Sequence, residues 1–433
     1  MSEATGLPAR RAALAALAAV DEDDAYGNLA VPAAVEHLED ARDRAFASHL
    51  AYDTLRWQGT LDWALQHVLS RPLTDVEPAL RRVLRLGALQ LLRSGVPSRA
   101  SVSTSVTLAR EAVPARRAQG AGGFVNGVLR NLDRRRDALP WPDPDDDPVA
   151  SLALTTAHPE WVVRDLLTRY DRDRTRAILE ADDAPPGVTL RATGDRDALV
   201  AELLAEGLDA RPGALPEAVR VPGADPRRLA AVREGRAAVQ DEASMAVAHA
   251  TGARPGDRVL DLCAGPGGKS AHLATLVGED GHIDAVELHP HRARLIRETA
   301  ERLGVAVTVH VGDATKPPVP PQASYERVLL DAPCTGLGTG RRRPEVRWRR
   351  QATDVADLAG LQRQLLEAAA ERVAPGGTLT YSVCTWTTGE TEQVARWFDA
   401  AHGSRFEAQE RRQLLPDADD TDGMYVTTWR RRS

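Results

Sequence analysis

Apolar positions in the first third of the chain repeat with a helical spacing. From residue 8 to about residue 137 they recur three and four positions apart, as in "RDRAFASHLAYDTLRWQGTLDWALQHVL" and "VEPALRRVLRLGALQLL". That spacing places them on one face of a helix, and no strand with alternating apolar and polar positions interrupts the run. The pattern therefore predicts an all-helical domain over residues 1–138.

A segment rich in proline and aspartate follows. "LPWPDPDDDPVA", residues 139–150, contains four prolines and four aspartates. Prolines remove backbone donors that a helix needs, and neighbouring aspartates repel one another, so we predict a linker over residues 139–158. A short helix is expected after Pro159. Then "GVTLRAT", "RDALVAELLAEGL" and "AVRVPG" have the patterns of a strand, a helix and a strand, and they predict a small α+β connecting module over residues 159–235.

Strand and helix patterns alternate from residue 236 to residue 433. Short apolar runs such as "RVLDLC", "HIDAVEL", "VTVHVGD", "RVLLDAP" and "TLTYSVC" are separated by helical patterns such as "HRARLIRETAERLG". This alternation predicts a doubly wound, mostly parallel sheet of the Rossmann-like α/β class. Such sheets bind ligands at the carboxyl ends of their strands, so the chemistry is expected there.

Composition excludes several classes of protein. The formal net charge of −7 argues against a uniformly basic nucleic-acid binder, although it leaves room for a local basic patch. The three cysteines include no CxxC pair, so we expect neither a metal site nor a disulfide framework. No run of about 18 uncharged apolar residues is present, and the alanine-rich N-terminal run lacks a convincing cleavage site. We therefore expect a cytoplasmic protein with no membrane contact, and a monomer.

A glycine-rich turn follows the first strand of the predicted sheet, in "VLDLCAGPGGKSAHLA", residues 259–274. An ATP-binding phosphate loop needs glycine where this chain has Cys263, and Pro266 removes one backbone N–H that would donate to phosphate. The dinucleotide-binding pattern Gly-x-Gly-x-x-Gly is matched at Gly265 and Gly267, but its third glycine is replaced by Ser270. The glycines instead allow a ligand without phosphate to approach the backbone closely.

Carboxylates stand at or just past the ends of four successive predicted strands, at Asp261, Glu287, Asp313 and Asp331. S-adenosylmethionine offers ribose hydroxyls, an adenine amino group and a cationic amine, and a carboxylate can accept from each. Any one of these acids could merely be solvated or cap a helix, but four in order favour this cofactor. We expect Glu287 to bind the ribose hydroxyls and Asp313 the adenine edge. The expected cofactor-binding residues are Cys263, Ala264, Gly265, Pro266, Gly267, Gly268, Lys269, Glu287, Asp313 and Asp331.

Two cysteines follow neighbouring predicted strands, in "LLDAPCTGLG" and "TYSVCTWTTGETEQ". Enzymes that methylate exocyclic amines use an Asp/Asn-Pro-Pro-aromatic stretch, whereas this chain has Asp-Ala-Pro-Cys. C5 of cytosine becomes nucleophilic only after a thiolate has added to C6, which is chemistry that cysteine can perform. A single free cysteine is most often a small buried apolar residue, but two beside a cofactor site predict carbon methylation. The expected catalytic residues are Cys384, Cys334 and Asp331.

Several stretches resemble a known family. "DLCAGPGGKS", "LLDAPCTGLGTGRRRPEVRW" and "YSVCTWTTGETE" are similar to the motifs of RNA 5-methylcytosine methyltransferases. The helical region, with "LAYDTLRW" and "FVNGVLRNL", resembles the NusB-like RNA-binding domain of their bacterial RsmB (Sun/Fmu) branch, the 16S rRNA (cytosine-C5) methyltransferases. The resemblance implies that Cys384 attacks C6, that Cys334 assists product release, and that residues 236–433 form the methyltransferase domain. The chain has Val383 where the family usually has threonine, and Thr-Gly-Glu-Thr at residues 388–391 in place of Pro-Glu-Glu-Asn.

The same resemblance implies a substrate. It points to a cytosine in a stem-loop of small-subunit ribosomal RNA, met before the subunit is assembled, and such a base must be unpaired or flipped out. The helical domain would then be a second RNA-binding site, although a helical bundle serves protein contacts equally well. The α+β module is a further candidate for RNA binding.

A basic run, "RRRPEVRWRR", directly follows the first cysteine loop. Runs of charge are usually solvated, but this one lies next to the predicted reactive strand end, and arginine donates bidentate hydrogen bonds to phosphate. Its tryptophan could stack on a base or pack inward. The expected RNA-binding residues are Arg341, Arg342, Arg343, Arg347 and Trp348.

Together these patterns predict an S-adenosylmethionine-dependent RNA (cytosine-5-)-methyltransferase of the EC 2.1.1 class. It would act on 16S ribosomal RNA through a covalent cysteine–C6 intermediate. Two alternatives stay open. One is the same chemistry on tRNA, and the other is a non-catalytic RNA-binding or antitermination factor with a vestigial methyltransferase fold.

Overall fold

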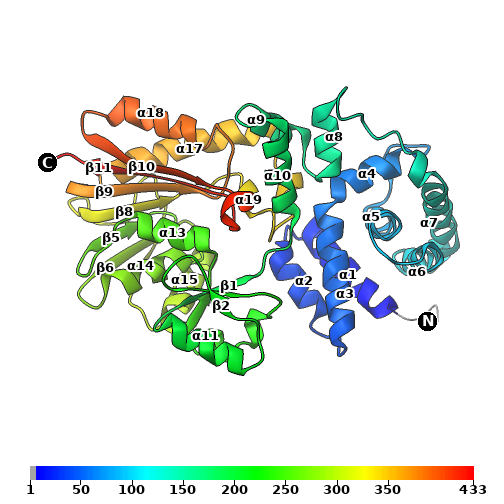
Figure 1. Ribbon diagram of the computed structural model, residues 1–433, viewed down its shortest axis with the longest axis horizontal. Helices are drawn as coiled ribbons and strands as arrows, with labels where there is room; N and C mark the ends of the chain where they lie inside the picture. Colours follow the sequence, from blue (N-terminus) through cyan, green and yellow to red (C-terminus); the bar gives the residue numbers. More distant parts are fainter. Residues whose placement is uncertain (1–5) are drawn as a thin grey trace. The chain divides into compact units, whose positions relative to one another are not determined.

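The computed structural model describes residues 6–433, so the first five residues of the predicted helical domain lie outside the described residues (Figure 1). The chain divides into two compact units. One contains the residues up to Asp183 together with Arg342–Arg350, and the other contains Ala184–Arg341 together with Gln351–Ser433. No helix within residues 6–433 is long and apolar enough to cross a membrane.

The first unit is helical, as its apolar spacing predicts. Its central helix, α5 (Pro78–Leu92), is buried on nearly every side and is contacted by α1, α3, α4, α6 and α7. The helices are α1 (Leu7–Glu22), α2 (Gly27–Val35), α3 (Ala41–Arg56), α4 (Gln58–Gln66), α5, α6 (Ser98–Glu111), α7 (Ala115–Arg135), α8 (Pro148–Thr155), α9 (Glu160–Leu167), α10 (Arg172–Asp183) and α16 (Val346–Arg349), with short 3₁₀ turns at Leu73–Asp75 and Arg136–Ala138.

Helix α8 begins inside the segment predicted to be a linker. Asp147 caps it, because its Oδ1 accepts from the backbone N–H of Ala150 at 3.0 Å. Pro148 occupies the first helical turn, where its missing N–H costs nothing. The same proline and aspartate that break a helix interior therefore start one here. Helices α9 and α10 fall in the helical unit.

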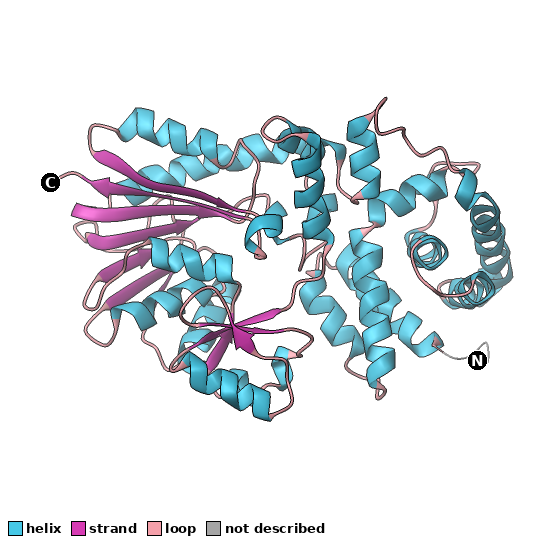
Figure 2. Cartoon of the chain, in the orientation of Figure 1, coloured by secondary structure: helices cyan, strands magenta, loops and turns pink. Residues whose placement is uncertain are grey.

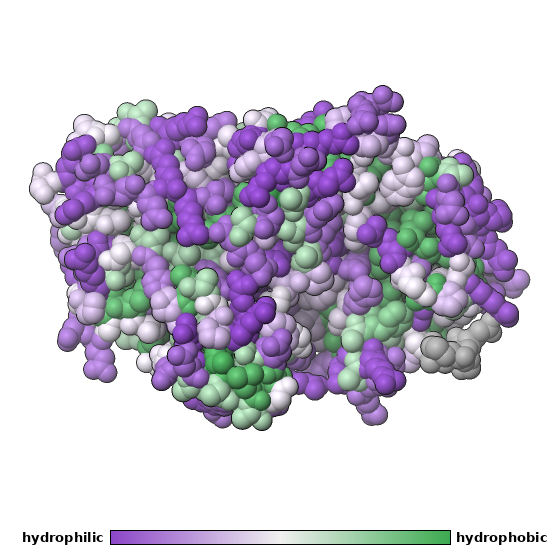
Figure 3. Space-filling view, viewed as in Figure 1, coloured by the Kyte–Doolittle hydropathy of each residue, from purple (hydrophilic) through white to green (hydrophobic). Residues whose placement is uncertain are grey.

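The second unit opens with a small antiparallel sheet. The predicted strand, helix and strand are β1 (Val188–Ala192), α11 (Arg196–Ala205) and β3 (Ala218–Val221). Figure 3 shows apolar surface over α11, which carries the exposed Leu204. Strands β2 and β4 are too short to show an alternation of apolar and polar residues in the sequence. They complete the sheet, whose strand order is β2-β3-β1-β4. The remaining elements are β2 (Arg211–Pro212), a 3₁₀ turn at Pro226–Arg228, α12 (Ala230–Arg233) and β4 (Ala237–Val239).

The large sheet has the predicted doubly wound form, with strand order β10-β11-β9-β8-β5-β6-β7. Strands β5 to β9 run parallel, and β11 and β10 close one edge antiparallel. Helices α13, α14 and α15 cover one face and α17 and α18 the other (Figure 2). The elements are α13 (Glu242–Ala250), β5 (Arg258–Asp261), α14 (Gly268–Val277), β6 (His282–Glu287), α15 (Pro290–Arg302), β7 (Thr308–Val311), β8 (Tyr325–Asp331), a 3₁₀ turn at Leu337–Thr339, α17 (Ala352–Ala370), β9 (Val373–Val383), α18 (Glu392–His402), β10 (Phe406–Leu414), α19 (Pro416–Asp419) and β11 (Met424–Arg431).

The strand order reverses at β5. The chain proceeds from β5 to β6 and β7 in one direction, then returns to place β8 and β9 on the other side of β5. Loops leave β5 and β8 on opposite faces at such a point, which opens a crevice at their carboxyl ends. This crevice holds the ends of the strands that carry Asp261 and Asp331.

Candidate active site

The loop after β5 approaches the end of β6 closely. A Cβ on Gly265 would lie 2.2 Å from Oε2 of Glu287, so no other residue fits there without displacing that carboxylate. Gly267 has a φ of +105° and caps α14, and a Cβ on it would lie 2.9 Å from the Cα of Ile296. The two glycines therefore let this loop pack closely against Glu287 and α15, and its approach to a ligand stays a prediction.

The first two strand-end acids are buried. Oδ2 of Asp261 accepts from the Ser270 hydroxyl at 2.7 Å, whereas its buried Oδ1 has no hydrogen-bond partner among the described residues. Burial raises the pKa of Asp261 to about 6. Oε1 of Glu287 accepts from the backbone N–H of His289 at 2.9 Å, and its Oε2 lies 3.5 Å from the Arg292 guanidinium. Both carboxylates therefore keep accepting capacity that these contacts do not use.

The other two acids differ in exposure. Asp313 is exposed after β7, and the backbone N–H of Thr315, which donates to its Oδ1 at 2.8 Å, lowers its pKa. Asp331 ends β8, where its Oδ2 accepts from Lys269 Nζ and its Oδ1 from the Ser382 hydroxyl, each at 2.8 Å. The structure therefore clusters Lys269 with Asp331 and leaves Asp313 further along the strand edge.

Lys269 does not act as a phosphate-loop lysine. Burial alone would lower its pKa, but the adjacent Asp331 carboxylate outweighs that effect and the pKa is raised. The side chain is therefore an ammonium, paired with a carboxylate at the end of a neighbouring strand. Attraction to Cys384 adds to the same shift, so this positive charge also favours a thiolate at that sulfur.

The two predicted reactive cysteines meet. Cys334, after β8, and Cys384, directly after β9, place their sulfurs 3.4 Å apart. The hydrogen bond with Cys384, and then burial, raise the pKa of Cys334 well above its ordinary value. Cys334 is thus a thiol at neutral pH, and its S–H can donate to the Cys384 sulfur. The arrangement provides one nucleophilic sulfur with a proton donor beside it.

The third cysteine has a different environment. Cys263 lies in the loop after β5, and burial raises its pKa, followed by the charge of Asp261. It is a protonated thiol that packs against the apolar core of the sheet. Its predicted backbone contact to the cofactor stays a prediction.

Sequence reasoning did not single out Ser382 or Glu390 as site residues. Ser382 lies two residues before Cys384, on the same side of β9, and that period-two spacing was the available signal. Glu390 accepts from the backbone N–H of Thr335, next to Cys334, at 2.8 Å. Only the fold brings Glu390 to Thr335, so no sequence pattern signalled that contact.

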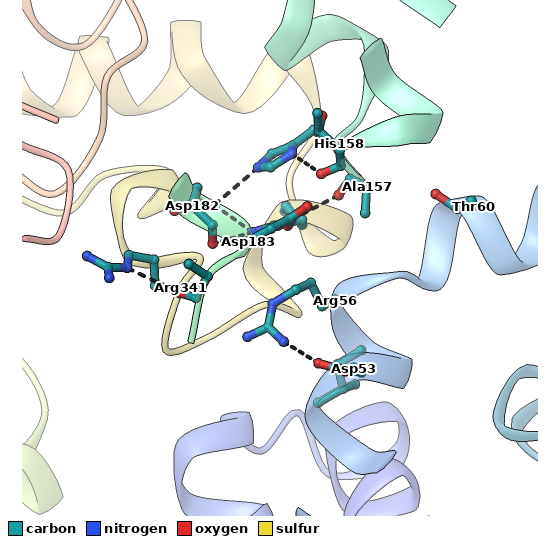
Figure 4. Close-up of polar contacts among 12 residues, drawn as sticks. Asp53, Arg56, Thr60, Ala157, His158, Asp182, Asp183 and Arg341 are labelled. Carbon is teal, nitrogen blue, oxygen red and sulfur yellow. Dashed lines mark hydrogen bonds and ion pairs between the residues drawn. The ribbon is translucent and has the colours of Figure 1, made fainter. Parts of the chain in front are cut away.

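The basic run lies largely in the interior of the protein. Arg347 is 1% exposed and donates to Asp182 at 2.5 Å and Asp183 at 2.6 Å. Figure 4 shows these two aspartates beside His158, whose ring contacts Asp182 at 3.1 Å. Trp348 points inward, and its Nε1 donates to the backbone oxygen of Leu55 at 2.8 Å.

The remaining arginines of the run differ in accessibility. Arg341 is buried in the second unit and donates to Oδ1 of Asp420 at 3.1 Å. Arg342 and Arg343 are half-buried, and the Arg343 guanidinium lies 5.0 Å from the Tyr26 ring centroid. Contact with RNA stays a prediction for this segment, in which Arg342 and Arg343 are less buried than Arg341 and Arg347.

Within residues 6–433, one cluster carries groups that could ligate a metal. Glu217 Oε1 lies 2.8 Å from Nε2 of His249 and 3.0 Å from Nε2 of His272. A metal-bound histidine donates its other ring N–H to a partner, but Nδ1 of His272 is buried without one among those residues. The neighbouring Arg191 guanidinium also opposes a cation. The cluster fits a hydrogen-bonded carboxylate better than a metal centre.

Comparisons with known proteins match each part of the chain. Residues 7–134 match the NusB family, residues 158–226 the ferredoxin-like domain of RsmF/B-like methyltransferases, and residues 249–430 the 16S rRNA methyltransferase RsmB/F model. The chain is 40% identical to the putative methyltransferase Rv1407 of Mycobacterium tuberculosis, over 98% of this chain and 96% of that protein. It is 33% identical to a probable ribosomal RNA small subunit methyltransferase B of Bacillus subtilis, over 98% of both.

Solved structures give the same picture of the fold. The crystal structure of PH0851 matches 98% of both chains with a TM-score of 0.86 and 25% identity. NSun6 from Pyrococcus horikoshii, solved with SFG, matches 64% of this chain and 98% of its own with a TM-score of 0.58. At 21% identity this second likeness concerns the fold alone.

Proposed function

This chain belongs to the RsmB/F family of methyltransferases, and we propose that it transfers a methyl group from S-adenosylmethionine to C5 of a cytosine in 16S ribosomal RNA. The observation that carries the proposal is the 3.4 Å contact between the Cys334 and Cys384 sulfurs at the strand ends beside the crevice. A paired thiol and thiolate serve carbon methylation and have no role in methylation of an exocyclic amine.

The crevice residues fit the cofactor. The Asp261 Oδ1, buried without a partner among the described residues, suits a cationic amine. Glu287 would bind the ribose hydroxyls and Asp313 the adenine edge, and Leu288, which follows Glu287 and is 56% exposed, would offer apolar surface to the adenine. The loop from Cys263 to Lys269 would contact the methionyl part through its backbone. When bound, the cofactor supplies an electrophilic methyl group.

The cysteines would act in sequence on the base. The Cys384 thiolate adds to C6, and the electron pair of the C5–C6 double bond moves to C5, which takes the methyl group. Loss of the C5 proton to solvent then restores the double bond, and the Cys384 sulfur takes the electron pair of the C6–S bond as it leaves. Cys334, held as a thiol at 3.4 Å, can return a proton to the departing sulfur. The Lys269 ammonium supports the starting thiolate by its charge.

The choice of ribosomal RNA rests on the relatives. Those named ribosomal RNA small subunit methyltransferase B share both the helical and the catalytic parts of this chain. The same cysteine chemistry on tRNA is the second candidate. Mapping 5-methylcytosine in total RNA from cells with and without this gene tests both, because the position lost identifies the substrate. If cells without the gene keep every 5-methylcytosine, the remaining alternative is a non-catalytic RNA-binding factor.

A further inference from the structure

Both cysteines are followed by a buried threonine, and the two threonines touch. Thr335 follows Cys334, Thr385 follows Cys384, and their hydroxyl oxygens lie 2.8 Å apart. The side chains are no more than 1% exposed. The turn that carries Cys334 and the turn that carries Cys384 are therefore in direct contact through the residues that follow the two cysteines.

One buried carboxylate, that of Glu390, accepts hydrogen bonds from the residues around this threonine contact. Glu390 is 0% exposed, and its Oε1 accepts from the backbone N–H of Thr335 at 2.8 Å and from Gln362 Nε2 at 3.1 Å. Its Oε2 accepts from the hydroxyls of Thr335 at 2.6 Å and Thr387 at 2.7 Å. Four donors saturate the carboxylate, which keeps it an acceptor although burial raises the pKa of Glu390.

The hydrogen-bond directions follow from this. Because the Thr335 hydroxyl donates its one proton to Glu390, the Thr385 hydroxyl must donate to Thr335. Gln362 holds the other side of the Cys334 turn, since its Nε2 also donates to the backbone oxygen of Pro333 at 2.9 Å. The backbone on both sides of Cys334 is thus held by one network, which the Cys384 turn joins through Thr385.

We propose that Glu390 is a positioning residue that locks the two cysteine turns together and so holds the Cys334 and Cys384 sulfurs in contact. It touches neither substrate nor cofactor, and acts through Thr335 and Thr385. This inference rests on the proposed function only for its consequence, which is the rate of methyl transfer. The sulfur placement itself is a property of the folded chain.

The substitutions separate positioning from folding. Glu390→Gln can keep the network, because its amide oxygen accepts from the Thr335 N–H while both hydroxyls turn to accept from its NH₂. Glu390→Ala leaves four buried donors without an acceptor. Thr385→Val breaks the link between the turns without touching the carboxylate, and serves if Glu390→Ala fails to fold. Glu410→Gln, an exposed glutamate of β10, is the matched control.

The experiment measures sulfur placement without needing methylation. Diamide takes two electrons and two protons from a neighbouring thiol pair to leave a disulfide, and mass spectrometry of peptides identifies the Cys334–Cys384 bridge. We expect Glu390→Ala and Thr385→Val to form it about tenfold more slowly than the unaltered protein, since this reaction depends on orientation. Glu390→Gln and Glu410→Gln should form it at the unaltered rate. Affinity for S-adenosylmethionine, measured by calorimetry, should stay within about twofold in all of them.

Methyl transfer gives the second readout. In reducing buffer, kcat on a ribosomal RNA transcript should fall about 10- to 100-fold in Glu390→Ala, with KM for RNA unchanged, and Glu390→Gln should restore most of it. If Glu390→Ala or Thr385→Val binds cofactor and forms the bridge at the unaltered rate, the positioning role is refuted. If the bridge rates follow expectation but the unaltered protein methylates no RNA, the positioning role stands and the proposed function fails.

Discussion

The guanidinium of Arg347 donates to the carboxylate of Asp182 at 2.5 Å, with each side chain 1% exposed, although 165 positions separate the two residues. Arg347, which belongs to the basic run predicted to bind RNA, is therefore paired with an acid inside the helical unit. Burial alone would raise the pKa of Asp182, but Arg347 and then His158 together outweigh burial, and the pKa is lowered. The pair therefore joins residues 342–350 to the helical unit.

Removing this partner should destabilise the protein. Arg347→Met leaves Asp182 and Asp183 without their shared cation, and an uncompensated buried charge costs about 3–5 kcal/mol. Because the folded-state pKa of Asp182 is depressed, its contribution is present above the unfolded pKa of about 4 and is lost as pH falls further. Urea unfolding at pH 7 should show the loss. The control Arg116→Ala, at an exposed site on α7, should unfold at the same urea concentration as the unaltered protein. If Arg347→Met also has the unfolding midpoint of the unaltered protein, the ion pair with Asp182 does not stabilise the fold.

The accessible arginines of the same run give a separate prediction. If Arg342 and Arg343 contact phosphates, replacing both by alanine should weaken RNA binding and reduce the log–log salt slope by about 0.7–0.9 for each lost contact. Filter binding over a range of salt concentrations measures this. Arg396→Ala, whose side chain is 73% exposed on α18, is the control. An unchanged slope in the double variant would leave this segment with a structural role only.

Glu287 is expected to determine cofactor affinity. Glu287→Ala removes a charged acceptor for the ribose hydroxyls, and loss of such a hydrogen bond costs about 1.5–3 kcal/mol, or roughly ten- to a hundredfold in affinity. Calorimetric titration with S-adenosylmethionine is the measurement, with Glu301→Ala on the exposed side of α15 as the control. Equal affinity in both variants would remove Glu287 from the cofactor site.

Asp261 should make stability depend on pH in the opposite sense to Asp182. Its folded pKa is raised from 3.8 to about 6, so its contribution is fully present below about pH 4 and is lost as pH rises through about 6. Asp261→Asn cannot ionise. Its free energy of unfolding without cofactor, relative to that of the unaltered protein, should rise by about 3 kcal/mol between pH 4 and pH 8. A pH-independent difference would show that burial does not perturb this carboxyl.

The two cysteines should give opposite phenotypes. Cys384→Ala removes the nucleophile, so both methylation and covalent RNA adducts should vanish. Cys334→Ala still permits attack and methyl transfer but lacks the neighbouring proton donor, so RNA should remain attached to the protein on a denaturing gel. The double variant should trap none. Trapping by Cys384→Ala alone would reverse the roles, and normal methylation by both single variants would exclude the thiol mechanism.

Much of the site was predictable because it depends on local sequence. The glycine turn between a strand and a helix, the acids at strand ends and the cysteines after β8 and β9 are features of short segments. A parallel sheet gathers the ends of its strands at one edge, whatever the side chains elsewhere. The predicted association of Asp331, Cys334 and Cys384 follows from that rule, and the observed sulfur contact agrees with it.

The sequence by itself determined the helical first unit, the parallel strands β5 to β9 and which chemical groups reach the edge of their sheet, because helix and strand periods and turn residues act over a few positions. Only the tertiary structure decided the partners of those groups. Lys269 pairs with Asp331 across 62 positions, Glu390 holds Thr335 across 55, and Arg347 is buried against Asp182. Buried charges and donors must find partners wherever the folded chain brings them close, and no local pattern encodes that distance.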